Sequence, residues 1–274
     1  MSSPRRWLFA DQLGPHFLDD GQDAVLIEAR SVFRRRRFHR RKAHLVLSAL
    51  RHRAAELGER AVLVQAETYR GALSELGEPV EVCAPTSRAA EDFVRGLDAV
   101  HLAPERGWVM TRDEFEVWAR GRSRLRLEDY YLDVRRRLVL LVEPDGSPVG
   151  GRWNCDADNR QAPPADARRL TDAVDVPEPW WPVEDDIDAG VRETLDRWER
   201  DHGVAFVGRD GPRRFAVTHE EATAALEHFV AHRLDAFGPF EDAMLADDPW
   251  MAHSALSVPL NLGLLDPVEV VRRA

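Results

Sequence analysis

A short segment near the end of the chain has residue types suited to binding an anionic group. Ser254 and Ser257 stand three apart at the start of an apolar run that closes with Gly263 and Asp266-Pro267. This spacing predicts a turn into a buried helix, with hydroxyls and unpaired backbone N–H groups on one side. Such a site favours phosphate through its donors and its dipole. Taken alone, the spacing fits ordinary helix N-caps more often than a phosphate site.

A second polar group follows the first strand-like run. Asp11 and Gln12 come directly after residues 7–10, which are apolar. An acid and an amide that leave a buried strand together can hydrogen-bond a heterocycle or a ribityl chain. They can equally cap the neighbouring loop, and both interpretations stay open on chemistry alone.

Alternating apolar runs and amphipathic stretches predict the fold that positions these groups. Strands are expected at residues 7–10, 24–27, 61–64, 80–83 and 99–102. Helices are expected between them, at residues 42–57, 69–76 and 89–97. This rhythm predicts an α/β domain with a doubly wound, five-stranded parallel sheet, whose ligands bind outside the carboxyl ends of the strands.

We expect three parts: an α/β domain over residues 1–141, a connector over 142–186, and a helical domain over 187–274. Proline and glycine interrupt the connector throughout, and its tryptophans are expected to anchor it. Thr111 with Glu114 has capping-box spacing and opens a stretch that reads as helical to about Leu141. Thr218 with Glu221 shows the same spacing before another expected helix.

Composition restricts the class of protein. The chain has 274 residues, 44% of them hydrophobic, as in a globular protein. Its net charge of −10 argues against a general nucleic-acid coat. The window from Arg30 to Arg53 is nevertheless strongly basic, which fits a solvated helix face or an anion-binding patch. No apolar run suits a membrane span and no signal peptide is recognisable, so we expect a cytoplasmic protein.

Metal and cluster chemistry find little support in the sequence. Cys83 and Cys155 cannot supply the four thiolates that an iron–sulfur cluster normally takes. His228 and His232 lie four apart on one face of an expected helix and could supply two ligands of a metal site. No third ligand follows at a spacing typical of such sites. We therefore predict no metal site.

The segment from His253 reads His-Ser-x-Leu-Ser-x-x-Leu-Asn-x-Gly-Leu-Leu. It resembles the flavin-phosphate segment of the photolyase/cryptochrome family, in particular the prokaryotic photolyase-related branch with the iron–sulfur cryptochromes and (6-4) photolyases. In that family the segment holds the FAD diphosphate, and a nearby aromatic, often tyrosine, helps to enclose it. The resemblance implies FAD contacts from Phe240, His253, Ser254, Ala255, Leu256 and Ser257.

The N-terminal part resembles the same branch. A first strand ending in Asp-Gln-Leu, and a basic run before Leu47-Ser48-Ala49-Leu50-Arg51-His52, match segments of a domain that there carries an antenna chromophore, a lumazine. Val32 and Arg35 depart from the acid and tyrosine of lumazine-binding members. The resemblance implies antenna contacts from Ala10, Asp11, Gln12, Leu13, His39 and Lys42.

Together these resemblances imply a flavoprotein of light-dependent DNA repair. Excited, reduced FAD would pass an electron to a pyrimidine lesion flipped out of damaged DNA, in a lyase reaction of the deoxyribodipyrimidine or (6-4) photolyase type. The family's catalytic residues and cluster cysteines would lie beyond Ala274. We therefore expect a truncated flavin domain with a partial FAD site, no cluster, impaired repair, and apolar helical surface that invites association.

Two other classes of function stay open. One is a non-enzymatic α/β module that binds a chromophore or a nucleotide and serves as a sensor. The other is an α/β protein whose basic window binds nucleic acid or another polyanion.

Overall fold

The computed structural model describes residues 4–274, which form two compact units. Unit 1 consists of the described residues up to Gly107 together with Trp181–Ala225 and Leu256–Asp266. Unit 2 consists of Trp108–Trp180, Leu226–Ala255 and Pro267–Ala274. Each unit is therefore assembled from segments that are far apart in the chain. The three-part division of the sequence near residues 141 and 186 stays a prediction.

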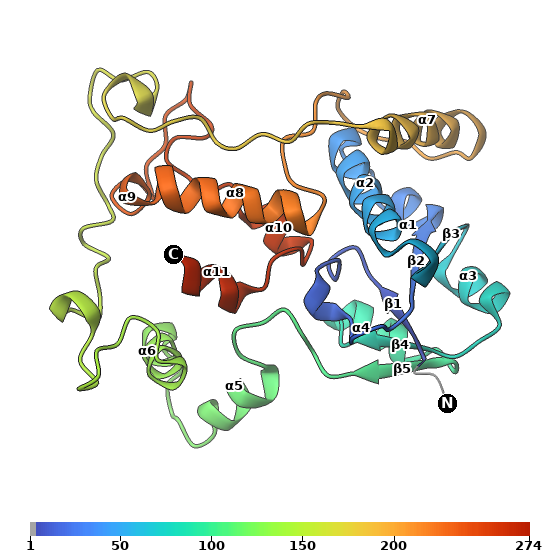
Figure 1. The fold of residues 1–274 in the computed structure, drawn as a ribbon, viewed down its shortest axis with the longest axis horizontal. Coiled ribbons are helices and arrows are strands. Elements are labelled where there is room, and N and C mark those ends of the chain that lie inside the picture. Colours follow the sequence, from blue (N-terminus) through green and yellow to red (C-terminus); the bar gives the residue numbers. More distant parts are fainter. Residues whose placement is uncertain (1–3) are drawn as a thin grey trace. The chain divides into compact units, whose positions relative to one another are not determined.

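Unit 1 is built around a parallel sheet (Figure 1). Its strands are β1 (Arg5–Leu8), β2 (Ala24–Ala29), β3 (Ala61–Ala66), β4 (Val80–Cys83) and β5 (Val100–Ala103). They lie in the order β3-β2-β1-β4-β5, and every pairing is parallel. The predicted doubly wound, five-stranded sheet is confirmed. Its strand order reverses between β1 and β4, which makes the carboxyl ends of these two strands the switch point where such sheets bind ligands.

Helices cover both faces of this sheet. They are α1 (Arg30–Arg35), α2 (Arg40–Leu57), α3 (Tyr69–Leu76) and α4 (Arg88–Arg95). Val25 and Ile27 of β2 share a core cluster with Leu73 of α3 and Val94 of α4. Glu28 lies between such residues in the alternating pattern of a strand and so faces the α2 side. The face covered by α3 and α4 thus carries an apolar core cluster, while the α2 face also carries a buried acid.

A third layer lies outside α2. Helix α7 (Asp186–Asp201) packs on α2 through a stripe of buried residues that includes Leu195 and Trp198. The indole of Trp198 reaches Phe33 of α1, with ring centroids 5.4 Å apart. This contact extends the core of the α/β fold into a segment that follows 165 positions later in the chain.

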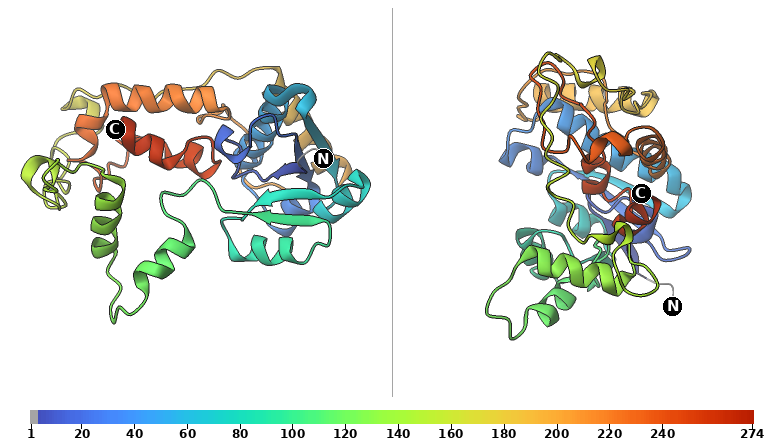
Figure 2. Two further views of the ribbon diagram at one scale, coloured as in Figure 1. Left: turned by 60° about the horizontal axis from the view of Figure 1, so that its bottom comes forward. Right: turned by 90° about the vertical axis from the view of Figure 1, so that its left-hand side faces the viewer.

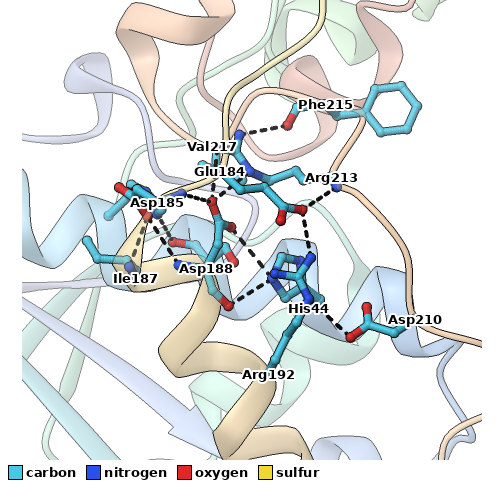
Figure 3. Close-up of polar contacts among 12 residues, drawn as sticks. His44, Glu184, Asp185, Ile187, Asp188, Arg192, Asp210, Arg213, Phe215 and Val217 are labelled. Carbon is cyan, nitrogen blue, oxygen red and sulfur yellow. Dashed lines mark hydrogen bonds and ion pairs between the residues drawn. The ribbon is translucent and has the colours of Figure 1, made fainter.

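The N-terminal end of α7 is held by a buried guanidinium (Figure 3). The side chain of Arg213 is 1% exposed. Its Nε lies 3.2 Å from Asp188 Oδ2, and its two Nη atoms donate to Glu221 at 2.6 and 3.0 Å. It also donates to the backbone carbonyls of Val183 and Phe215. Arg213 therefore joins the approach to α7 with the start of α8 (His219–His232).

The capping box expected at Thr218 is half formed. Glu221 N donates to Thr218 Oγ1 at 3.0 Å, as the pattern predicts. The Glu221 carboxylate, however, accepts from Val217 N and from Arg213. The competing ion pair with a buried cation explains the difference, since a charged donor makes the stronger bond.

The apolar run near the end of the chain also belongs to unit 1. It begins with α10 (Ser257–Asn261), and the N–H of Leu13 donates to the carbonyl of Leu262 at 3.1 Å. Leu264 and Leu265 are buried. Gly263 has φ +65°, and a Cβ at this position would overlap the carbonyl of Asp11 and the ring of Phe17. Only glycine fits this close approach without strain.

Unit 2 is helical with long irregular connections. Its helices are α5 (Arg112–Ala119), α6 (Leu127–Leu138), the second part of α8, α9 (Leu234–Phe237) and α11 (Pro267–Arg273). The Thr111–Glu114 capping box is confirmed. The single helical stretch expected to about Leu141 is wrong, because the chain breaks between α5 and α6. Gly121 adopts φ +77° there, and the residues around it lack apolar periodicity.

The Pro- and Gly-rich connector carries two short 3₁₀ turns, Val149–Gly151 and Leu170–Asp172. Trp153 of the connector stacks with two arginines of α6. The guanidinium carbons of Arg135 and Arg136 lie 5.0 and 4.6 Å from the centroid of its ring. This tryptophan anchors the connector, as predicted. Also in unit 2, α11 runs beside the second part of α8 (Figure 2). Arg273 of α11 forms an ion pair there with Glu227 of α8.

None of the helices in residues 4–274 combines the length and apolar character needed to cross a membrane.

We expect Arg213→Ala to lower the free energy of unfolding by about 3–5 kcal/mol, because it leaves buried Asp188 without its cation. Arg213→Lys should recover part of this loss, since an ammonium keeps the charge but not the fork. The measurement is urea unfolding followed by circular dichroism. Arg214→Ala is the control: this exposed neighbour stacks over Trp181, and its loss should cost below about 1 kcal/mol. Equal effects at the two positions would contradict the assignment.

A second stability prediction concerns the approach at Gly263. Gly21 has a similar φ of +69°, but its Cβ would meet open space. Gly21→Ala should therefore cost only the left-handed backbone strain, about 1–2 kcal/mol. Gly263→Ala should cost a further ~1–3 kcal/mol for the overlap with Asp11 and Phe17. Thermal unfolding of the two variants side by side checks this, and equal losses would exclude the docked position of Gly263.

Candidate functional site

A cavity of about 170 Å³ lies in unit 1 at the carboxyl ends of β1 and β2. An engineered cavity of ~150 Å³ binds benzene, so this space suits a compact ring system and not a whole dinucleotide. Apart from Glu28 and the phenol of Tyr69, the lining is aliphatic or aromatic: Trp7, Leu8, Phe9, Ala10, Ile27, Ala29, Val32, Phe33, Phe38, Val46, Leu47 and Leu50.

The acid in the cavity wall is fully paired. Glu28 has no exposed side-chain surface, and the guanidinium of Arg51 on α2 donates to its two carboxylate oxygens at 2.7 and 3.0 Å. Gln65 Nε2 donates to the same carboxylate at 2.8 Å. Arg51 also donates to Thr194 Oγ1 of α7 at 3.0 Å. This fork fixes Glu28 as a rigid polar edge of the cavity and links β2, α2 and α7.

The phenol in the wall stays protonated. Tyr69 packs against Trp7 and Phe9, with ring centroids 5.2 and 5.7 Å apart. Burial disfavours the phenolate and, with a smaller contribution from the negative charge of Asp11, raises the pKa of Tyr69 to about 12. At neutral pH the Tyr69 hydroxyl is therefore available as a hydrogen-bond donor.

The residues after β1 occupy the switch point. Asp11 Oδ2 accepts a hydrogen bond from Thr86 Oγ1 at 2.7 Å, just beyond β4. Gln12 is buried, and its Nε2 donates to the carbonyl of Cys83 at 3.0 Å. These bonds connect the end of β1 to the end of β4 and the loop that follows it. The side-chain nitrogen of Gln12 therefore has the capping role that the sequence left open. Within residues 4–274 the buried Gln12 Oε1 has no hydrogen-bond partner, which leaves one acceptor at the switch point.

The other predicted antenna residues are spread around this edge. Ala10 lines the cavity. Leu13 is buried, and its backbone is bonded to Leu262. His39 is exposed and caps α2, where its Nδ1 accepts from Arg41 N at 3.2 Å. Lys42 lies with its Nζ 5.6 Å from the ring centroid of Phe38, a lining residue. The structure thus brings Ala10 and Lys42 to the cavity or its wall and gives His39 a capping contact.

Four arginines stand in the sequence between two residues of the aromatic wall. Phe33 and Phe38 line the cavity, and the four arginines between them are exposed. Arg34 pairs with Glu67. In the part of the chain that the structure describes, the remaining three have no ion-pair partner: Arg35, Arg36 and Arg37. A ligand whose ring enters the cavity would meet this positive rim with any anionic substituent.

The residues predicted to contact FAD are divided between the two units. Phe240, His253, Ser254 and Ala255 belong to unit 2, whereas Leu256 and Ser257 belong to unit 1. Their common site therefore stays a prediction. Phe240 packs on a small core of unit 2 that contains Leu170 and Met251.

Ser257 does not cap the helix that follows it. Leu256 is the N-cap residue of α10 and makes no side-chain cap, and Ser257 is the exposed first residue of the helix. Ala255 adopts φ +57°, a left-handed conformation that is strained for alanine. The N-cap interpretation is thus wrong for Ser257, because Leu256 occupies the cap position, and for Ser254 it stays a prediction.

Of the predicted antenna residues, Ala10 lines the cavity, and the segments that resemble the family also contain the lining residues Val32, Leu47 and Leu50. The wall has two further sources that were not predicted: the connection between α1 and α2, and the first residue of α3. One signal was present: the carboxyl ends of parallel strands lie at one edge of the sheet, so the segments that follow them meet there. That rule points to Phe33, Phe38 and Tyr69 as soon as the strands are assigned.

The pKa of Tyr69 gives a direct test of this environment. Of the three tyrosines in the chain, Tyr69 should titrate last, at about pH 12. Since its folded pKa lies above the usual 10, its contribution to stability is complete below pH 10 and is lost as the pH rises toward 12. An ultraviolet titration of tyrosinate checks this. Tyr69→Phe should remove the highest step, and survival of that step would show that the phenol is not buried.

Comparison with known proteins identifies the family of this chain. A family model described as deoxyribodipyrimidine photo-lyase-related protein matches residues 6–205. The chain is also 33% identical, over 292 aligned positions, to a (6-4) photolyase of Agrobacterium fabrum (strain C58). This alignment covers 97% of the chain and 55% of the relative, so the chain spans about half the length of that protein.

Proposed function

Because the chain belongs to the deoxyribodipyrimidine photo-lyase-related protein family, we propose that it is a photolyase- or cryptochrome-like chromoprotein whose cavity holds an antenna ring. The observation that carries the proposal is the ring-sized cavity at the carboxyl edge of the sheet, with its apolar wall and positive rim. Ligand sites are expected at this edge of a doubly wound sheet. A member of a light-dependent family has a use for a chromophore there.

The residues present fit a small heteroaromatic ring. The aromatic wall can stack on it, Tyr69 can donate to one of its acceptors, and Gln12 Oε1 offers an acceptor nearby. A lumazine has a ring of suitable size. Val32 and Arg35 replace the acid and tyrosine of lumazine-binding members, so the contacts would differ from theirs.

FAD is the second group in this proposal, bound through the segment from His253 to Ser257. The cavity is too small for FAD, so the two groups would occupy separate sites. When bound and reduced, the flavin supplies the light-driven electron for a pyrimidine lesion in damaged DNA. This chain's residues would bind the diphosphate end through backbone N–H groups and hydroxyls. The (6-4) photolyase relative supports a lesion of that class as substrate.

A binding titration tests the antenna proposal. Purified full chain is titrated with a ribityl lumazine and, separately, with FAD, following the fluorescence of the ligand. We expect saturable lumazine binding at one per chain. Ala10→Phe fills the cavity and should weaken this binding at least tenfold, whereas Ala55→Phe, on the exposed face of α2, should not. Lumazine binding that Ala10→Phe leaves unchanged, or no binding at all, would rule out the cavity as the antenna site.

A second candidate function rests on the exposed arginines. Arg35, Arg36 and Arg37 could bind a nucleic-acid backbone without any chromophore. Salt-dependent DNA binding that is lost when all three become glutamine, and that light does not affect, would favour this function. Light-dependent repair of a lesion-bearing oligonucleotide would instead favour the photolyase-like one.

A further inference from the structure

Two helices of unit 1 bring a histidine and two aspartates together, and the two aspartates are labelled in Figure 3. His52 lies on α2, and Asp185 and Asp188 lie at the N-terminal end of α7. One ligand atom of each residue lies within 4.8 Å of the other two. His52 Nε2 is 3.1 Å from Asp185 Oδ2. Two ligands of a tetrahedral zinc ion stand roughly 3.3 Å apart, so this pair already has the required spacing.

The ring of His52 is oriented as in a metal ligand. Its Nδ1 lies 2.7 Å from the carbonyl of Ser48, which can only accept, so Nδ1 carries a proton. In the neutral ring Nε2 is then an unprotonated donor atom for a metal, and it faces Asp185 Oδ2. Metal-binding histidines commonly fix their other nitrogen on a backbone carbonyl in this way. Two electron-rich atoms 3.1 Å apart need a cation or a proton between them.

Each aspartate uses one oxygen to cap α7 and keeps the other. Asp185 Oδ1 accepts from the N–H groups of Ile187 and Asp188, which leaves Oδ2 for His52. Asp188 Oδ2 accepts from Asp185 N and from Arg213. Asp188 Oδ1 is fully buried, and within residues 4–274 it has no hydrogen-bond partner. A buried carboxylate oxygen without a donor is costly, so Oδ1 points to a ligand.

The neighbouring His44 does not satisfy this oxygen. Its Nε2 lies 3.6 Å from Asp188 Oδ1, beyond hydrogen-bond distance, and is bonded to the Asp188 carbonyl at 3.1 Å. His44 therefore donates no hydrogen bond to Asp188 Oδ1.

Carboxylates outnumber guanidiniums in this network: Glu184, Asp185, Asp188, Asp210 and Glu221 lie around Arg192 and Arg213. The negative charge in excess favours a bound cation. The α7 dipole disfavours a cation at this end, but the capping oxygens already satisfy its first N–H groups.

We propose that one Zn²⁺ binds His52 Nε2, Asp185 Oδ2 and Asp188 Oδ1, with water completing the tetrahedron. One imidazole and two carboxylates suit zinc and its neighbours in the first transition row. Water reaches the site because the Asp185 side chain is 53% exposed. The ion would pin α7 to α2, the helix that supplies one wall of the cavity. No local pattern indicates this site, since His52 and Asp185 are 133 positions apart in the chain.

Metal titration of the full chain tests the proposal. The protein is stripped with a chelator and titrated with Zn²⁺ by calorimetry, and with Co²⁺ as a visible probe of tetrahedral geometry. We expect one saturable site, a tetrahedral Co²⁺ spectrum and a higher Tm with Zn²⁺. His52→Ala should weaken binding at least tenfold. His202→Ala, an exposed histidine at the other end of α7, should leave it unchanged.

Asp185→Ser keeps the test valid if His52→Ala does not fold. Serine still caps α7 but is too short to share an ion with His52, so the helix should persist while zinc affinity falls at least tenfold. Absence of saturable binding in the folded wild type would overturn the proposal. So would equal affinity in the wild type and in Asp185→Ser. A wild-type Tm that Zn²⁺ leaves unchanged would equally overturn it.

Discussion

The burial of Arg213 is the constraint on which the rest of unit 1 depends. A guanidinium that is 1% exposed must keep all its partners, because the cost of an unpaired buried charge exceeds that of almost any single lost contact. Its partners are the Val183 and Phe215 carbonyls and the carboxylates of Asp188 and Glu221. These four lie on separate stretches of residues 183–221, so one side chain fixes how the chain runs over α2.

Hydrogen bonds connect this outer layer to the helix that lines the cavity. Arg51 bonds Thr194 of α7 on one side and Glu28 of β2 on the other, so α2 is held between an outer helix and the sheet. The same helix supplies Val46, Leu47 and Leu50 to the cavity. Protein cores are close-packed, and an unfilled space of this size forfeits contacts on every wall. A rigid frame that keeps such a space open fits a binding site better than a packing defect.

Local patterns predicted the elements well and their assembly poorly. Apolar runs separated by amphipathic stretches specify a parallel sheet because period and length are encoded within each segment. The Thr111 cap and the anchoring role of Trp153 follow from similarly short-range rules. The docking of Leu262 on Leu13 has no local signal, since it joins residues about 250 positions apart.

The residues of the candidate site likewise fall into those predictable from local patterns and those that depend on the tertiary structure. Ala10, Asp11 and Gln12 were predictable because they follow a strand. Tyr69 and Phe38 came to the cavity through the crossover topology, and the pairing of Glu28 with Arg51 needed the helix and the sheet to be placed together. The bond between Arg213 and Glu221 overrode the full capping box that the spacing indicated, because a buried charge outranks a local cap.

Segments from distant parts of the chain complete the α/β unit as one cooperative body. Amide hydrogen exchange, measured segment by segment, tests this cooperativity directly because exchange reports the free energy of local opening. We predict that residues 187–201 and 262–265 are protected to the same degree as β2, and lose protection together with it in denaturant. Free exchange of these two segments while β2 stays protected would contradict it, and would leave the sheet as an independent domain.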